Sequence, residues 1–270
     1  MILWGAREGA LVVVSALLVL ATPAGARCPN HSEGQLAIII DDLGYNLEQG
    51  QAVASLPAPI TLAIIPETPH AQTLAELATA HGKEVMVHMP MASSSAELAE
   101  PLVLEKGLTR REINTRIERA LASVSGAQGL NNHMGSALTQ HQSAMQHLME
   151  ALRDRGLYFI DSRTTPDTLA ELTARRVGVP AASRSVFLDN VIEAEAIAAQ
   201  LDKALLAALE QGFAIAIGHP HDETVKVLNE RLPSLPTTVT IVGASAIARC
   251  GEVGVGMPDG DPAGGPQAED

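Results

Sequence analysis

Hydrophobic and polar positions follow two rhythms along the chain after residue 34. Short continuous apolar runs have the length of buried strands, and the segments between them carry apolar residues at helical spacing. We predict strands in QLAIIID, ITLAIIP, EVMVHM, GLYFIDS, SVFLD, FAIAIGHP and TTVTIVG. We predict helices in HAQTLAELATAHG, TRREINTRIERALASV, SAMQHLMEALRDRG, PDTLAELTARRVG, EAEAIAAQLDKALLAALEQG and DETVKVLNERL.

The alternation of these elements predicts the fold class. Apolar strands that alternate with amphipathic helices are typical of a parallel sheet covered by helices. Seven or eight such units favour an α/β fold in the form of a distorted β/α barrel with seven to eight mostly parallel strands. Two carboxylates and one glycine follow the first strand, in place of a glycine-rich phosphate loop, which argues against a nucleotide-binding open sheet. No linker divides residues 34–250, so we predict one domain there.

The N-terminal residues have the pattern of an export signal. Arg7 precedes an apolar run at 11–21, and the small residues at 24–26 fit a cleavage site. Eleven apolar residues are too few to span a bilayer. We therefore predict a signal peptide over 1–26, a stub over 27–33 and a periplasmic protein without stable membrane insertion after cleavage. An uncleaved anchor is the alternative.

Charge and cysteine content add two expectations. The last twenty residues, 251–270, hold five acids, no bases, six glycines and three prolines, which is the composition of a disordered tail. The whole chain has a formal net charge of −13, and a nucleic-acid partner needs a basic face, so we expect none. Cys28 and Cys250 bracket the predicted domain and could form a disulfide in an oxidising compartment. Two unrelated thiols are the alternative.

Aspartate and histidine stand at the ends of the predicted strands. The carboxyl ends of strands in β/α folds converge on the active site, so six such ends predict one polar pocket. A lone aspartate after a strand is more often a helix N-cap, and Asp189 could be only that. His221 could line the rim or cap the last helix. The strand-end residues are Asp41 with Asp42, His88, His133, Asp161, Asp189 and His219.

The chemistry of these side chains indicates a metal. Imidazole and carboxylate ligands suit zinc or a similar divalent ion, and a catalytic site uses about three protein ligands. Consecutive strand residues face opposite sides, so Asp41 and Asp42 both reach the pocket only if the strand ends between them. One would bind the metal and the other act as a base. A buried ion-pair cluster is the rival interpretation, although only Arg163 and Arg184 lie near the strand ends.

Six motifs carry a family resemblance. In chain order, IIIDDLG, GKEVMVHMPM, GLNNHMGS, GLYFIDSRTT, VFLDN and AIAIGHPH resemble the divergent polysaccharide deacetylase family, which is related to the NodB-type carbohydrate esterases. The resemblance runs from about residue 34 to 248. It implies a distorted β/α barrel of about seven strands, a divalent metal, with zinc expected, and removal of N- or O-acetyl groups from a polysaccharide.

The resemblance also implies roles for individual residues. Asp41 would be the catalytic base, Asp42 a metal ligand, and His219 the histidine that protonates the leaving group. Ordinary deacetylases carry two metal histidines one helical turn apart, and this chain has no such pair. We assign the isolated His88 and His133 to the metal, and His219 could exchange roles with either.

The remaining candidates surround these residues. The stretch GLNNHMGSALTQ, residues 129–140, has no helical or strand periodicity, so turn chemistry alone does not explain its histidine. Within it, we expect three neighbours of that histidine to orient it or face the substrate. Asp161 is a further catalytic candidate. The expected orienting or substrate-binding residues are Asn131, Asn132, Ser136, Tyr45 and Arg163.

Departures from the family pattern leave two functions open. Ala92 with Ser93, Ala137 and Ser185 stand where the family commonly has charged residues or proline. Only Tyr45 is well placed as an aromatic platform, which favours a small or short-chain glycan. The first hypothesis is an exported metal-dependent deacetylase, and the second is an inactive envelope protein that binds a glycan or a protein. A metal phosphoesterase is disfavoured because basic residues near the strand ends are few.

Overall fold

The computed structural model describes residues 33–95 and 99–250. The predicted signal peptide, nearly all of the predicted stub and the predicted tail lie outside this part. Cys28 also lies outside it, so its pairing with Cys250 stays a prediction.

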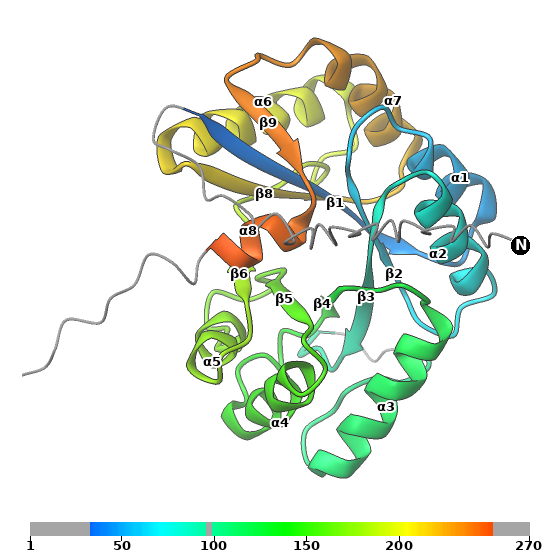
Figure 1. Cartoon of the computed structure of the whole chain (residues 1–270), viewed down its shortest axis with the longest axis vertical. Helices are drawn as coiled ribbons and strands as arrows, with labels where there is room; N and C mark the ends of the chain where they lie inside the picture. Colours follow the sequence, from blue (N-terminus) through cyan, green and yellow to red (C-terminus); the bar gives the residue numbers. More distant parts are fainter. Residues whose placement is uncertain (1–32, 96–98, 251–270) are drawn as a thin grey trace, which may run out of the picture.

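Strands and helices alternate along most of the described chain (Figure 1). The strands are β1 (Gly34–Leu43), β2 (Thr61–Ile64), β3 (Glu84–Met91), β4 (Gly129–Met134), β5 (Tyr158–Asp161), β6 (Ala181–Ser183), β7 (Val186–Phe187), β8 (Phe213–Gly218) and β9 (Val239–Val242). The helices are α1 (Leu47–Ala54), α2 (Ala71–Ala80), α3 (Arg110–Ser123), α4 (Gln142–Arg153), α5 (Ala170–Arg176), α6 (Ala194–Gln211), α7 (Asp222–Arg231), the 3-10 helix η1 (Leu232–Ser234) and α8 (Ala244–Cys250).

All strand pairs are parallel, in the order β6-β5-β4-β3-β2-β1-β8-β7, and β9 pairs with β1. On one edge of β1, β9 pairs with the first half of the strand (Gly34 opposite Val239) and β2 with the second half (Ile39 opposite Thr61). β8 lies on the other edge. The predicted distorted parallel barrel is confirmed, with nine strands in the described residues in place of seven or eight.

The two ends of the sheet meet in one extended segment. β6 pairs with β5, and β7, two residues further on, pairs with β8. Between them, the Arg184 N–H donates to the carbonyl of Asp161 at 2.9 Å, and the Ser185 N–H donates to that of Ile215 at 2.8 Å. The chain therefore crosses from one edge of the sheet to the other at this seam.

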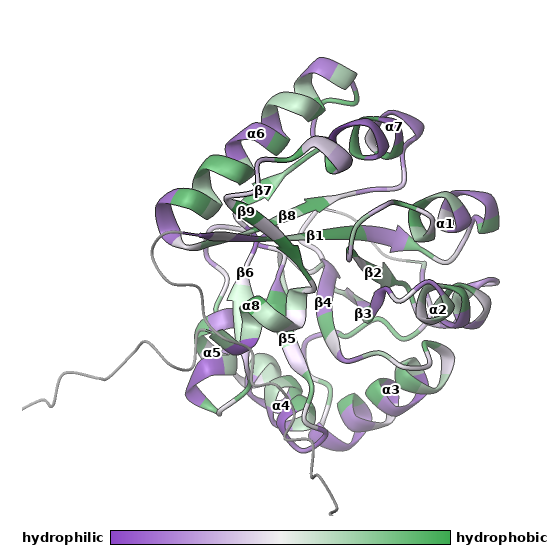
Figure 2. Cartoon of the chain, turned by 45° about the horizontal axis from the view of Figure 1, so that its top comes forward, coloured by the Kyte–Doolittle hydropathy of each residue, from purple (hydrophilic) through white to green (hydrophobic). Residues whose placement is uncertain are grey.

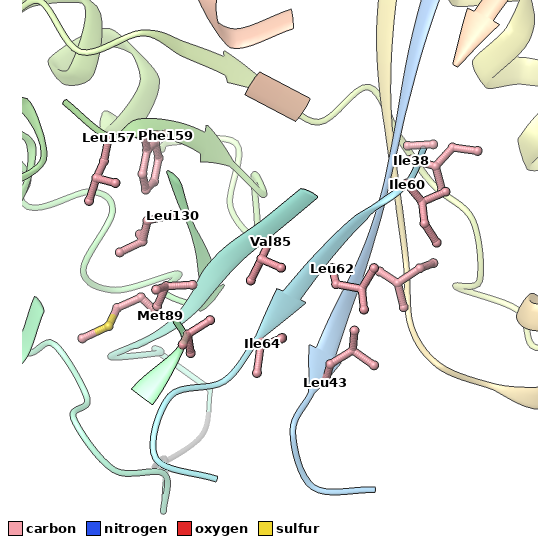
Figure 3. Close-up of a cluster of buried hydrophobic side chains, with 14 of the residues drawn as sticks. Ile38, Leu43, Ile60, Leu62, Ile64, Val85, Met89, Leu130, Leu157 and Phe159 are labelled. Carbon is pink, nitrogen blue, oxygen red and sulfur yellow. The ribbon is translucent and has the colours of Figure 1, made fainter. Parts of the chain in front are cut away.

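Side chains of the sheet alternate between two cores. The larger core lies between the strands and the surrounding helices, and Figure 3 shows part of it. The smaller core fills the barrel: on β1, Ala37 and Ile39 face inward, whereas Leu36 and Ile38 face the helices. The strands are accordingly mostly apolar, whereas the helices combine apolar and polar faces (Figure 2).

Helix α8 covers one end of the barrel. Figure 1 shows α1 to α7 around the periphery and α8 over the middle, where its Ile247 joins the inner core. The Glu84 carboxylate accepts hydrogen bonds from the Ser245 N–H at 3.0 Å, the Ser245 hydroxyl and the Tyr158 hydroxyl at 2.7 Å. Glu84 and Tyr158 are the first residues of β3 and β5, so α8 covers the end of the barrel where the strands begin. The carboxyl ends of the strands lie at the opposite end.

Each predicted strand and helix contains an observed element of the same type, but five observed elements lie outside the predicted segments. They are α1, β4, β6, η1 and α8. Residues 129–134 form β4 although they lack strand periodicity, so the expected strand end at His133 is confirmed, while the strand itself was not among those predicted from apolar runs. Its inward positions carry polar side chains, so the usual apolar alternation is hidden. Among the described residues, no helix has the length and apolarity needed to span a membrane.

Candidate functional site

The inward row of side chains changes from apolar to polar toward the open end of the barrel. On β1, Ala37 and Ile39 are followed by Asp41, and on β3, Met86 is followed by His88. The same alternation applies to β4 and β8. The carboxyl ends of parallel strands lie at the same end of a barrel. Each of these four strands therefore places at least one polar side chain at the open end.

Asp42 reaches the site through an unusual backbone conformation. Its φ of 57° lies in the left-handed region, and the pairing of β1 with β2 shifts register between Ile40 and Leu43. The condition that the strand must end between Asp41 and Asp42 is therefore wrong. β1 continues to Leu43, and a bulge turns the second carboxylate inward.

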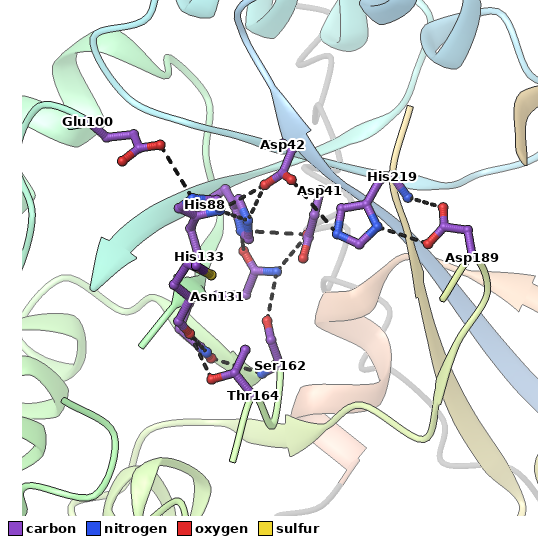
Figure 4. Close-up of polar contacts among 12 residues, drawn as sticks. Asp41, Asp42, His88, Glu100, Asn131, His133, Ser162, Thr164, Asp189 and His219 are labelled. Atoms are coloured by element: carbon purple, nitrogen blue, oxygen red, sulfur yellow. Dashed lines mark hydrogen bonds and ion pairs between the residues drawn. The ribbon is translucent and has the colours of Figure 1, made fainter. Parts of the chain in front are cut away.

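Three ligand atoms converge beside this bulge (Figure 4). The Asp42 Oδ1 atom lies 2.8 Å from His133 Nδ1 and 3.0 Å from His88 Nε2, and these two nitrogens are 3.1 Å apart. Among the described residues, the neighbours of Asp42 Oδ1 within hydrogen-bond distance are these two imidazoles, which belong to the cluster itself. One carboxylate and two imidazoles that share a focus fit a zinc-like ion, whose ligands each lie at about 2.0–2.2 Å.

Asn131 orients one of these ligands. This fully buried amide accepts from His88 Nδ1 through its Oδ1 at 2.7 Å and donates to Asp41 Oδ1 through its Nδ2 at 2.8 Å. With its proton on Nδ1, His88 presents Nε2 to the shared focus. Asn131 therefore acts as the outer partner that metal-binding histidines usually have.

The charges of the cluster depend on one another. Burial raises the pKa of Asp41 above its ordinary value, although His88 partly opposes this effect. Burial also disfavours charge on Asp42, but His133 and His88 outweigh it and hold the pKa of Asp42 far below the ordinary value. Burial lowers the pKa of His88, and Asp41 and Asp42 raise it more strongly, to about 9. Without an ion, the aspartates and His88 therefore titrate as an interacting group.

His219 and Asp189 form a second arrangement next to the first. His219 Nδ1 lies 2.9 Å from Asp189 Oδ1, and Asp189 Oδ2 accepts from the His219 N–H at 2.6 Å and the Thr224 hydroxyl at 2.9 Å. His219 Nε2 is 3.9 Å from Asp42 Oδ2. Asp189 is thus a partner of His219, and Glu193 is the N-cap of the following helix α6. Burial disfavours charge on His219, but the bond to Asp189 raises its pKa.

A cavity of about 480 Å³ opens beside His219. His221 lines it and is also the N-cap residue of α7, so both interpretations of this histidine hold. Asp189, His219 and His221 could hold an ion as well. Asp189 accepts from a backbone N–H and the Thr224 hydroxyl as well as from His219, whereas the neighbours of Asp42 Oδ1 are the two imidazoles of its own cluster, so we favour the first cluster for the metal. The lining residues are Asp42, Gln49, Asp189, His219, Pro220 and His221.

Two predicted site residues lie on the outer row of their strands. Asp161 follows the inward Ile160, and its carboxylate accepts from the Arg163 N–H at 2.8 Å and the Thr168 hydroxyl at 2.8 Å. Asn132 accepts from the Ser162 N–H at 2.9 Å. These contacts organise the loop after β5. The catalytic role of Asp161 and the site role of Asn132 stay predictions.

The other predicted substrate residues lie around the rim. The Ser136 hydroxyl accepts from the Ser94 N–H at 3.0 Å and joins two loops. Tyr45 is 51% exposed and lies beside the cluster, close enough for the charges of Glu100 and Asp42 to act on it. Partial burial and these two charges raise the pKa of its hydroxyl. Arg163 is exposed and has a left-handed φ of 48°. Their substrate roles stay predictions.

Two residues near the site received no role from the sequence. Arg184 donates through Nε to the Ser162 carbonyl at 2.8 Å, and its guanidinium lies 3.7 Å from the centroid of the Phe187 ring. Glu100 lies in the loop after β3, with Oε1 3.6 Å from His133 Nε2. A loop glutamate between a serine run and a proline carries no periodic signal, so only the folded chain reveals this contact.

The chain matches known proteins in sequence and fold. A model of the divergent polysaccharide deacetylase family matches residues 38–248. The uncharacterized protein YibQ of Escherichia coli is 38% identical over 248 residues, which cover 92% of this chain and 76% of that protein. An uncharacterized protein of Haemophilus influenzae is 38% identical over 218 residues, which cover 81% and 78% of the two chains.

A crystal structure of an uncharacterized protein from Agrobacterium tumefaciens has the same fold. Its TM-score is 0.75 at 24% sequence identity, and the match covers 80% of this chain and 89% of that one. At this identity the likeness concerns the fold alone. The family model, in contrast, spans the strands that carry the polar cluster, from β1 to α8. The chain therefore belongs to the divergent polysaccharide deacetylase family.

Proposed function

We propose that this protein is a hydrolase, dependent on a divalent metal, that removes acetyl groups from a glycan of the cell envelope. The observation that carries the proposal is the convergence of Asp42, His88 and His133 beside the His219–Asp189 pair. The family supports a carbohydrate substrate. The proposal includes zinc as the ion and a periplasmic location, the latter from the signal-like pattern of residues 1–26.

The roles of the residues follow from their surroundings. Asp42, His88 and His133 would hold the ion, which when bound polarises an acyl carbonyl and makes water more acidic. Asp41 is buried and held by Asn131 on one oxygen, which suits a general base that removes a proton from the attacking water. His219 has its Nδ1 engaged by Asp189 and donates a proton from Nε2 to the departing amine or alcohol.

The experiment is acetate release from a panel of N- and O-acetylated oligosaccharides by zinc-loaded protein. We expect release by the wild type and a loss of about 10²- to 10⁴-fold in kcat for Asp41→Asn and His219→Ala. The matched control is His81→Ala, which changes an exposed histidine at the C-terminal end of α2. Zinc-loaded wild type that releases no acetate from any member of the panel would contradict the proposal.

The cavity supports a short substrate. Its lining is made of carboxylate, amide, imidazole and proline side chains, and the residues that line it include no phenylalanine, tyrosine or tryptophan to stack on a sugar. Tyr45 is the exposed aromatic side chain near the cluster. We therefore expect the best rates with one to a few sugar units, and little gain in kcat/KM for longer chains.

A second function has an observation in its favour. Uncharged residues occupy three positions where the family commonly has charged groups: Ala92, Ala137 and Ser185, whose hydroxyl accepts from the Ile215 N–H at 3.2 Å. A protein that lost these charges could keep the barrel and bind a glycan without hydrolysis. Calorimetric binding of the acetylated oligosaccharides together with no acetate release would favour this alternative.

A further inference from the structure

Glu100 reaches the polar cluster from outside the strands that build it. Its Oε1 atom lies 3.6 Å from His133 Nε2, on the side of the ring opposite the Asp42 contact (Figure 4). Its Oε2 atom is buried and has no hydrogen-bond partner among the described residues. The side chain is 19% exposed, and no lysine or arginine in the described ranges forms an ion pair with it. A glutamate on a solvated loop would not have this environment.

The backbone holds this glutamate in place. After β3 the chain returns at Leu104, whose N–H donates to the carbonyl of Pro90 and whose carbonyl accepts from the Ala92 N–H, both at 2.8 Å. Leu102, two residues after Glu100, has a left-handed φ of 64°, a conformation that side chains with a Cβ atom rarely adopt. Two backbone bonds and a strained turn thus direct the carboxylate toward the end of β4.

The chemistry of imidazole explains what this contact does. An imidazole that binds a metal through one nitrogen carries its proton on the other, and a carboxylate next to that N–H fixes the ring and strengthens the ligand. Asn131 performs this task for His88. In β4, His133 presents Nδ1 to Asp42 and His88, so its Nε2 is the nitrogen that needs an outer partner.

We propose that Glu100 is the positioning residue of His133: its carboxylate accepts a hydrogen bond from the Nε2–H group of His133 and thereby sets the affinity of the metal site. This inference rests on the proposed function, because it requires that the cluster binds a metal. It assigns a role to a residue of the loop after β3 that the sequence alone did not single out. Glu100 Oε1 and His133 Nε2 are 3.6 Å apart, which is longer than a hydrogen bond, and an approach of the side chains by about half an ångström would form one.

The test is the zinc dissociation constant, measured by competition with a chelator, for the full chain. We expect Glu100→Gln to raise the constant by about 10- to 100-fold and Glu100→Asp to recover part of the loss. The matched control is Glu105→Gln, which neutralises an exposed glutamate of the same loop and leaves the constant unchanged. Thermal unfolding of each variant verifies that the barrel is intact.

Two further readouts separate positioning through His133 from a general effect of charge. In the His133→Ala background, Glu100→Gln should have no further effect on the dissociation constant, because the residue through which it acts is gone. In zinc-loaded wild type, the Nε2–H proton of His133 should give a protected NMR signal that weakens in Glu100→Gln.

The outcomes are distinct. Wild type that binds no zinc overturns the proposed function and this inference with it. Zinc binding that is equal in wild type and Glu100→Gln overturns the inference alone. Equal losses in the presence and absence of His133 overturn the positioning role and leave only long-range attraction between the carboxylate and the ion.

Discussion

At the scale of single residues, the site depends on one aspartate with a left-handed backbone. The sequence places Asp41 and Asp42 at a strand end, but regular alternation would send one of them to the helical layer. The φ of 57° at Asp42 removes this conflict, and Asp and Asn are the residues besides glycine that adopt this region most readily. The backbone state of a single residue therefore decided whether both carboxylates reach the pocket, and no sequence pattern reports it.

Asp42→Asn tests the ligand role without changing the backbone. Asparagine tolerates the same φ and has nearly the same shape, so we expect metal-free protein to keep the fold, with a lower melting temperature because the ion pairs with His88 and His133 are lost. The amide is a poor metal ligand, and zinc content measured by mass spectrometry should fall from about one per chain to near zero. Zinc retained at wild-type stoichiometry would show that Asp42 is not a ligand.

Asp189→Asn tests the His219 pair through its titration. Asp189 raises the pKa of His219 above 6.5, and burial opposes it, so the pKa should fall when the carboxylate is removed. The raised pKa of His219 stabilises the fold below pH 6.5, and the lowered pKa of Asp189 stabilises it above pH 3.8. The pair therefore contributes most between these values, and the stability is lost as pH rises through the folded pKa of His219. NMR titration of His219 measures the shift, and an unchanged pKa contradicts the pairing.

At the scale of elements, apolar periodicity found the strands and helices that pack on apolar neighbours. It missed β4, because Asn131 and His133 occupy its inward positions. It missed β6 because three residues are too few for a pattern, and α8 because a seven-residue helix of small side chains resembles a loop. The unpredicted β4 carries part of the candidate site, so polar side chains stand at inward positions where packing alone would favour apolar ones.

Glu84→Gln tests how α8 is attached. The carboxylate accepts from Ser245 and Tyr158 in a largely buried position, and the amide offers only one acceptor oxygen and adds donors. Leaving a buried donor unpaired costs about 1–3 kcal/mol, so we expect the free energy of unfolding in urea to fall by that amount. The exposed Glu76→Gln is the control and should change it by less than about 0.5 kcal/mol.

Tyr158, at the same end of the barrel, makes the stability of the fold depend on pH above 10. Burial and the nearby Glu84 raise its pKa well above the ordinary value of 10, so the folded chain keeps a proton that the unfolded chain loses. Stability should therefore fall as pH rises above 10, by up to about 1.4 kcal/mol per pH unit. Urea unfolding of Tyr158→Phe should lack this contribution, whereas Tyr45→Phe, at the exposed tyrosine, should retain it.

At the scale of the whole molecule, the parallel β/α architecture could be predicted from alternation alone, but the way the barrel closes could not. The segment from β6 to β7 changes partner strand within two residues, and only backbone hydrogen bonds define that change. Ser185, noted in the sequence as a departure, donates its N–H to Ile215 and accepts from Ile215 through its hydroxyl. Its function in the fold was invisible without the partner strand.

Ser185→Pro tests this closure. Proline lacks the N–H that bonds the carbonyl of Ile215, and we expect unfolding to become easier by about 3 kcal/mol or more. Ser185→Ala keeps the N–H and loses only the hydroxyl, so its loss should be about 1 kcal/mol. Equal effects of the two substitutions would show that the seam does not depend on the backbone bond.

The shared edge of β1 has a consequence for how the chain folds. The first strand pairs with the last one, since Gly34 lies opposite Val239. An incomplete chain therefore exposes part of the edge of an apolar strand, and closing so large a loop is slow because the entropy cost precedes the contact. We expect slow refolding in stopped-flow fluorescence or circular dichroism, and aggregation of fragments that end before residue 239, which light scattering would detect. We therefore expect an added chaperone that binds exposed apolar segments to raise the refolding yield.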